Sequence, residues 1–330
     1  MPYKSLSTQQ PQIAVFDLLK VGLNESNDEG RPAFHAALRT RSRRPAFSAN
    51  ALQGGSITCN TQSGSAYARI AVLIESLSDP NINKIISGVE AIAGKAGYEI
   101  AILNVLGKES LRTGLDNFDG FIACYSDHAK LDLNFLDELG KPVVIVGNVE
   151  NPGRYHCVST DYRQGGQLAV NYLIDQGCQK IMMITAALTN TASDLEKYLG
   201  YRDALKKSGQ ALQEPWIVSE STIEAGMEIA AQMFEDGVLP EGIFVTNDWV
   251  AAGFIKFLKK AGSNIFAKTT VIGFGNESLC QMVEPDLCSI DFRKELAGST
   301  ALSLLVEQIS SRNFSVGSKI TIIEPALPVG

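Results

Sequence analysis

The chain lacks any hydrophobic run that approaches the roughly 18 to 20 residues needed to span a bilayer. The segment from Met1 to Gln12 is polar and has no hydrophobic core of the kind that a signal peptide carries. These two absences argue against an integral membrane protein and against a secreted one. We therefore expect a cytoplasmic protein without a membrane partner.

The chain is also poor in the residue patterns that build metal and catalytic sites. Its six cysteines are widely spaced without a C-x-x-C pair, and none of its three histidines lies in an H-E-x-x-H motif. G-x-S-x-G and P-loop motifs are absent. We expect a protein that is not an enzyme, that holds no metal or cofactor, and whose cysteines are mostly small apolar core residues.

The sequence does contain enough apolar residues for more than one core. Hydrophobic residues make up 45% of 330 positions, whereas single cores stop growing near roughly 250 to 300 residues. From Arg69 onward, apolar runs of strand length alternate with segments of helical apolar spacing that often end at glycine. This alternation predicts parallel sheets with right-handed crossovers, arranged as an α/β fold of two doubly wound lobes. Strands are expected at 70–74, 100–105, 120–125, 143–146, 180–185, 216–220, 242–245, 269–272 and 319–324, and helices at 82–96, 131–139, 164–176, 195–208, 226–236, 249–261 and 294–310.

Small polar residues follow several of these strands directly. Asn247 and Asp248 come after one buried strand, and Asn276 comes after the next. Because open α/β sheets bind ligands at the carboxyl ends of their strands, these positions predict a ligand site. Helix capping is the alternative for Asn247, and the same alternative applies to Asp79 and Asn81 after the first strand.

Charge divides the chain into a basic arm and an acidic body. Residues 31–69 contain six arginines and no acidic residue, although the whole chain has a net charge of -7. A basic arm suits contacts with nucleic acid phosphates, since each neutralised phosphate releases counterions. A solvated, disordered leader is the alternative interpretation.

Several motifs, taken in order, resemble the LacI/GalR family of transcriptional regulators. Residues 159–181 look like the family's lobe-crossing segment, in which a D-N-x-x-G-G core is typical, and Asp161, Gly165 and Gly166 match that core. Each motif alone is weak, but the combination is specific and covers about residues 66 to 330. The further matches are Gly200–Leu205, Phe244–Gly253, Val271–Phe274 and Pro285–Ile290, which leads into Gly298.

The resemblance implies a periplasmic-binding-protein-like effector domain whose two lobes are joined by three crossovers, near Asp161, Ile290 and Ile320. A small molecule would occupy the cleft, and hinge motion would be the two-state element that it biases. The expected boundaries are 1–56 for an atypical DNA-binding head with a hinge-like segment, 57–68 for a linker, 69–160 plus 292–319 for the first lobe, and 161–291 plus 320–330 for the second lobe.

The resemblance implies effector contacts from Asn247, Asn276, Lys197, Phe292 and Asp79, in that order. Three of these positions depart from the family pattern. Lys197 stands where an arginine often clamps the effector, Asn276 belongs to a Gly-Phe-Gly-Asn run in place of G-F-D-D, and Phe292 replaces a polar residue. Lys197 could instead be a solvated helix lysine, and Phe292 a core residue. Sugars and nucleobases are the effector classes that the family implies.

The amino-terminal region departs most from the family. The usual helix-turn-helix pattern is absent, but residues 44–55 are similar to the R-P-N-x-x-A-R-x-L hinge segment. This similarity implies contacts with operator DNA from Arg41, Arg43, Arg44, Asn50 and Leu52, with Leu52 as the wedge in the minor groove. A homodimer would match a palindromic operator, and the function would be that of a ligand-responsive repressor. The alternative is a cytoplasmic small-molecule sensor that has lost sequence-specific DNA binding.

Overall fold

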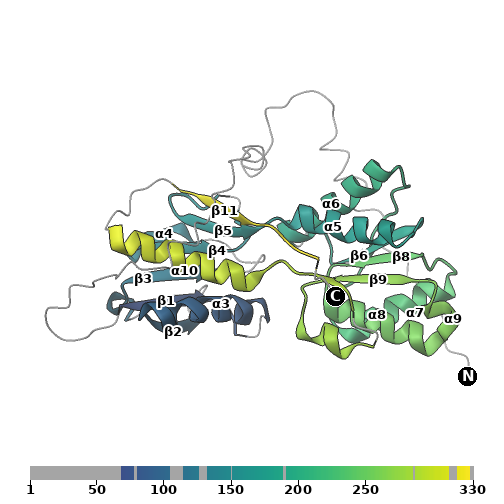
Figure 1. The fold of residues 1–330 in the computed structure, drawn as a ribbon, viewed down its shortest axis with the longest axis horizontal. Coiled ribbons are helices and arrows are strands. Elements are labelled where there is room, and N and C mark those ends of the chain that lie inside the picture. Colours follow the sequence, from purple (N-terminus) through teal and green to yellow (C-terminus); the bar gives the residue numbers. More distant parts are fainter. Residues whose placement is uncertain are drawn as a thin grey trace, which may run out of the picture. The chain divides into compact units, whose positions relative to one another are not determined.

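The computed structural model describes residues 68–77, 80–104, 114–125, 132–149, 151–188, 191–284, 287–311 and 318–327 (Figure 1). The amino-terminal positions expected to contact DNA, and one expected effector contact, lie outside these residues. They are Arg41, Arg43, Arg44, Asn50, Leu52 and Asp79.

The first lobe is built on a six-stranded parallel sheet of order β11-β5-β4-β3-β1-β2. Alternate residues of β1 point to opposite faces, so Ile70, Val72 and Ile74 join one core while Ala71 and Leu73 join another. Both faces are covered, which explains the continuous apolar runs of the central strands. The elements are β1 (Arg69–Ile74), α3 (Pro80–Ala96), β2 (Glu99–Asn104), η3 (Leu115–Asn117), β3 (Gly120–Cys124), α4 (Leu133–Glu138), β4 (Val143–Val146), β5 (His156–Thr160), α10 (Lys294–Ser311) and β11 (Ile320–Ile323).

The second lobe is built on a five-stranded parallel sheet of order β10-β9-β8-β6-β7. Helices α5 and α6 pack on one face and helices α7 and α8 on the other, each pair with its own hydrophobic cluster (Figure 1). The predicted α/β fold with two parallel-sheet lobes is confirmed. The elements are α5 (Tyr162–Asp175), β6 (Ile181–Thr185), α6 (Ala192–Ser208), β7 (Trp216–Ile217), α7 (Ile223–Glu235), β8 (Gly242–Val245), α8 (Asp248–Ala261), α9 (Ser263–Phe266), β9 (Thr270–Phe274), η4 (Ser278–Met282) and β10 (Ser289–Ile290).

The chain passes between the lobes close to Asp161 and close to Ile290. Its third passage comes after β11 and not near Ile320. β5 ends at Thr160 and α5 follows at Tyr162, while β10 ends at Ile290 and α10 follows at Lys294. The prediction that residues 320–330 belong to the second lobe is wrong for β11, which pairs in parallel with β5 in the first sheet. The strand pairing extends the first lobe through Ile323, and an antiparallel bridge from Asp291 to Ala326 follows.

Three helix pairs pack with a glycine on each partner. A Cβ atom at Gly166 on α5 would lie 2.3 Å from the carbonyl oxygen of Lys197, and one at Gly200 on α6 would lie 2.1 Å from that of Arg163. Backbone oxygens cannot yield to such contacts, so these glycines are required for close helix packing. The same arrangement joins α7 to α8 through Gly226 and Gly253, and α3 to α10 through Gly88 and Gly298.

The described cysteines have the structural character that the sequence predicts. Cys124, Cys157, Cys178 and Cys280 are buried and Cys288 is half-buried, all as free thiols. Burial raises the pKa of Cys157 to about 12. Burial, reinforced by the Asp248 carboxylate, does the same for the pKa of Cys280, which also reaches about 12. Both thiols therefore stay protonated near neutral pH and are poor nucleophiles.

Candidate functional site

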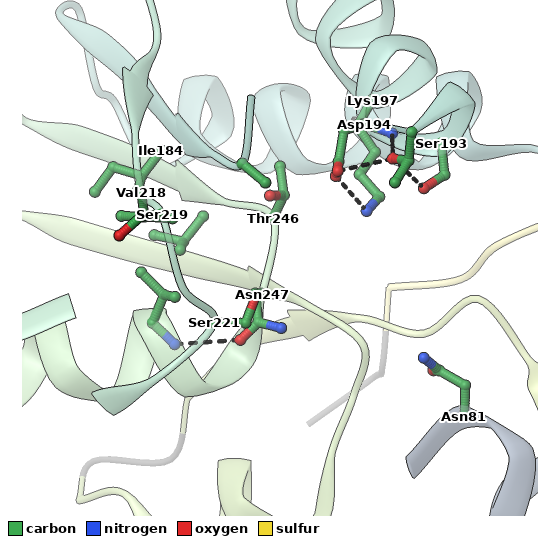
Figure 2. A pocket seen from close by; sticks show the side chains of 14 residues that line it. Asn81, Ile184, Ser193, Asp194, Lys197, Val218, Ser219, Ser221, Thr246 and Asn247 are labelled. Carbon is green, nitrogen blue, oxygen red and sulfur yellow. Dashed lines mark hydrogen bonds and ion pairs between the residues drawn. The ribbon is translucent and has the colours of Figure 1, made fainter. Parts of the chain in front are cut away.

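A pocket of about 330 Å³ lies at the carboxyl ends of β6 and β8 (Figure 2). This is the edge of the sheet where ligands of open α/β folds bind. Asn81 at the start of α3 is the contribution of the first lobe to the described lining, and the other lining residues belong to the second lobe. The lining consists of Asn81, Ile184, Ala186, Thr191, Ser193, Asp194, Lys197, Val218, Ser219, Ser221, Val245, Thr246, Asn247 and Val250.

Aliphatic side chains and hydroxyl groups line the pocket together. The aliphatic part comes from the ends of buried strands and includes Ile184 and Val245, which are almost fully buried. Hydroxyls come from Thr191, Ser193, Ser219, Ser221 and Thr246, and no aromatic ring occurs among the described lining residues. A few directional polar groups on an apolar floor are typical of a small-molecule site.

Asp194 and Lys197 form a buried ion pair in the wall of the pocket. Lys197 Nζ lies 3.1 Å from Asp194 Oδ1, and both residues are 8% exposed. The second carboxylate oxygen of Asp194 accepts a 2.8 Å hydrogen bond from the Thr191 hydroxyl, which also caps α6 by accepting from the Asp194 N–H. The wall therefore presents one positive and one negative group that largely neutralise each other.

Lys197 also contacts the aromatic cluster behind the pocket. Its Nζ atom lies 4.9 Å from the centroid of the Phe274 ring and 5.6 Å from that of Tyr162. Cation–π contacts of this kind fix an ammonium more firmly when water is excluded. Lys197 is thus a buried lysine on the pocket wall, rather than the solvated helix lysine considered as an alternative.

Asn247 caps a helix and also lines the pocket. Its Oδ1 accepts hydrogen bonds from the N–H groups of Trp249 at 2.9 Å and Val250 at 3.3 Å, so it caps α8. It also lines the pocket. Since the carbonyl oxygen is committed to the helix, the NH₂ group is what Asn247 can offer to a ligand.

Asn276 and Phe292 lie outside the described lining of this pocket. Asn276 follows β9 with a φ of 49°, and its backbone carbonyl is bonded to Lys84. Phe292 is 7% exposed and stacks on Phe274 with ring centroids 5.3 Å apart. Phe292 therefore packs in the core next to the second crossover, in agreement with the core alternative stated for it.

Asp248, next to Asn247, is buried and organises the loop after β9. One carboxylate oxygen accepts a 2.7 Å hydrogen bond from the Ser289 hydroxyl, and the other accepts a 2.9 Å bond from the Glu277 N–H. A Cβ atom at Gly273 would lie 2.1 Å from this carboxylate, and one at Gly275 would lie 2.9 Å from it. The glycines of the Gly-Phe-Gly-Asn run therefore make room for Asp248.

Comparison with known proteins agrees with this fold. A model of the periplasmic binding protein-like domain matches residues 170–326. Catabolite control protein A of Priestia megaterium is 28% identical over 248 residues, which are 73% of this chain and 75% of that protein. The repressor PurR of Photobacterium profundum is 27% identical over 269 residues, 78% of each chain. A LacI family regulator from Enterococcus faecium, solved with bound ribose, shares the fold with a TM-score of 0.66 at 22% identity, over 79% of this chain and 97% of that one.

The chain thus contains a periplasmic binding protein-like domain and is similar to transcriptional repressors of the LacI type, in line with the LacI/GalR resemblance of its sequence. Its departures from the LacI/GalR pattern now have physical explanations. Lys197 replaces the usual arginine, and Asp194 holds it in place one helical turn earlier. Gly275 replaces a carboxylate at a position where φ is 142° and where the Asp248 carboxylate is already close.

Most of the polar lining was missed by sequence reasoning. Asp194 lies three residues before Lys197 on the same helix face, and that spacing was a usable signal. Ser219 and Ser221 lie in the irregular segment between β7 and α7, where no periodicity points to a site.

The helices in the described part of the chain are all too short or too polar to span a bilayer. Within the same residues, no group of three or more histidine, cysteine, aspartate or glutamate side chains lies close enough together to hold a metal ion.

Proposed function

We propose that this chain is a ligand-responsive transcriptional regulator, in which a small molecule in the pocket shifts the affinity for operator DNA. The observation that carries the proposal is the pocket itself, a cavity lined by hydroxyl and aliphatic groups at the strand ends of a periplasmic-binding-protein-like domain. Hinge motion between lobes couples such a pocket to DNA, and the reciprocal coupling typically amounts to about 1 to 3 kcal/mol. A homodimer in the cytoplasm is part of the proposal, because a palindromic operator requires two matching heads.

The pocket favours a neutral, hydroxyl-bearing effector such as a sugar. The hydroxyls of the lining and the NH₂ group of Asn247 suit hydrogen bonds to several ligand hydroxyls. The ion pair of Asp194 and Lys197 leaves no unbalanced charge for a strongly ionic ligand. A nucleobase is the second candidate, and the lack of an aromatic side chain in the described lining disfavours it because stacking is unavailable.

Two substitutions at Asn247 separate capping from effector binding. Asn247→Ala should lower the free energy of unfolding by about 1 kcal/mol through the lost cap, and should weaken effector binding by about 1 to 3 kcal/mol. Asn247→Asp keeps a capping oxygen but has no NH₂ group, so it should keep the stability and lose the binding. Thermal-shift titration with a panel of sugars and nucleobases measures both effects. Wild-type affinity in a folded Asn247→Asp variant would limit Asn247 to capping.

DNA binding is tested by selection from random duplex DNA at several salt concentrations. The full chain should enrich a partly palindromic sequence, with affinity that falls as salt rises. A version that starts at Tyr67 should enrich none, and joint replacement of Arg41, Arg43 and Arg44 by alanine should weaken binding. Equal behaviour of the full and shortened chains would instead favour a small-molecule sensor without sequence-specific DNA binding.

A further inference from the structure

Lys84 reaches from the first lobe to the second. It lies on α3, and its Nζ atom donates hydrogen bonds to the backbone carbonyls of Gly275 at 2.9 Å and Asn276 at 2.8 Å, in the loop that follows β9. The same Nζ atom lies 3.5 Å from Glu277 Oε1. We call residues 275–277 the β9 loop. One ammonium group therefore engages three consecutive residues of the β9 loop.

The β9 loop is shaped to present these acceptors. The N–H of Asn276 donates to the Ser289 hydroxyl oxygen at 2.9 Å, and the N–H of Glu277 donates to Asp248 at 2.9 Å. Ser289 in turn donates to Asp248, which is 1% exposed. Because the amide hydrogens bond to groups within the second lobe, the carbonyls of Gly275 and Asn276 remain available to Lys84.

The backbone of the β9 loop is unusual in a way that matches this role. Asn276 has a φ of 49° and Gly275 a φ of 142°, both in the region that L side chains rarely adopt. Such conformations persist where surrounding contacts hold them, and here Asp248 and Ser289 supply the contacts. Asn276 thus acts through its main chain, which explains why its side chain is exposed.

The contact is shielded enough to be strong. The side chain of Lys84 is 23% exposed and that of Glu277 is 17% exposed. Hydrogen bonds from a charged donor are about twice as strong as those between neutral groups, and partial burial reduces screening by salt. An exposed surface pair would contribute much less.

We propose that Lys84 is an interlobe latch, which holds the two lobes in the arrangement seen here and sets the ratio of latched to open molecules before any effector binds. The proposal rests on contacts within the chain and is independent of the effector and of DNA binding. It also gives the backbone carbonyls of the β9 loop a role as acceptors for Lys84.

Single-molecule energy transfer on the full, ligand-free chain tests the latch. Dyes attached through unnatural amino acids at the exposed positions Lys141 and Lys207 report the separation of the two lobes. Lys84→Met removes the ammonium and keeps the apolar stem, and should raise the ratio of open to latched molecules roughly tenfold. Lys95→Met, which alters an exposed lysine at the end of the same helix, should leave the distribution unchanged.

A distribution for folded Lys84→Met that superimposes on that of the wild type would overturn the proposal. An equal shift in Lys95→Met would overturn it as well. The shift would then come from the loss of a positive charge on α3, and not from the loss of the contact between Lys84 and the β9 loop. If Lys84→Met does not fold, the Glu277→Gln variant tests the latch instead. It keeps both carbonyl acceptors and should shift the distribution toward open molecules by a smaller factor, and an unchanged distribution would reject the latch.

Discussion

Gly88→Ala is expected to lower the free energy of unfolding by about 3 kcal/mol, since overpacking a well-packed contact costs about 1 to 3 kcal/mol or more. A Cβ atom at Gly88 would lie 1.9 Å from the carbonyl oxygen of Glu295, so α3 and α10 would have to separate. These two helices cover one face of the first sheet, and their separation would open the core between them. Urea denaturation followed by circular dichroism measures the loss.

Gly94 provides a control of opposite sign in the same helix. Nothing lies within 4 Å of a Cβ atom placed there, and its φ is not positive. Gly94→Ala should therefore raise the free energy of unfolding by about 0.5 to 1 kcal/mol through helix propensity. If both variants shift stability in the same direction by similar amounts, close packing of α3 on α10 is not what requires glycine at position 88.

Asp248→Ala is expected to lower the free energy of unfolding by about 3 kcal/mol. The substitution leaves the Ser289 hydroxyl and the Glu277 N–H without their buried acceptor. Asp248→Asn keeps the shape and one accepting oxygen, so it should lose about half as much. The β9 loop should loosen in both variants, which hydrogen exchange at Asn276 and Glu277 would detect as faster exchange.

Asp175 is the matched control for this loss. It is exposed at the end of α5, and Asp175→Ala should change the stability by less than about 0.5 kcal/mol. Protection of the β9 loop that is unchanged in Asp248→Ala would show that the loop keeps its shape without the carboxylate. The account of Gly273 and Gly275 as space for Asp248 would then fail.

The fold was largely predictable because its strands are buried on both faces. Continuous apolar runs such as Ile70–Ile74 and Val143–Val146 can be predicted as strands from the local sequence alone. Glycines such as Gly97 and Gly209, which have positive φ, indicate where helices end. β5 escaped prediction because Ser159 and Thr160 are polar, although both are buried in the sheet. The third crossover was expected near Ile320, but the chain stays in the first sheet through Ile323 because β11 pairs with β5. The local sequence does not show how far such a pairing extends.

Residues of the candidate site could be predicted from the sequence only where the side chain itself lines the pocket. Asn247 and Lys197 both line the pocket, and strand-end position and family resemblance predict them as effector contacts. The backbone carbonyl of Asn276 accepts a hydrogen bond from Lys84, and Phe292 stacks on Phe274 in the core, and residue type predicts neither contact. Ser219 and Ser221 reach the pocket because of how the segment after β7 folds over the strand ends, which no local pattern encodes.

The measurement that tests the central claim most directly is the affinity of the full chain for its selected DNA, with and without each compound of a sugar and nucleobase panel. We expect at least one neutral compound to change that affinity by about 5-fold or more, as effector coupling of about 1 to 3 kcal/mol requires. The same compound should have no effect on Asn247→Asp, whose DNA affinity alone should match the wild type. A DNA affinity that no compound alters, or that changes equally in the variant, would contradict the claim that this pocket controls DNA binding.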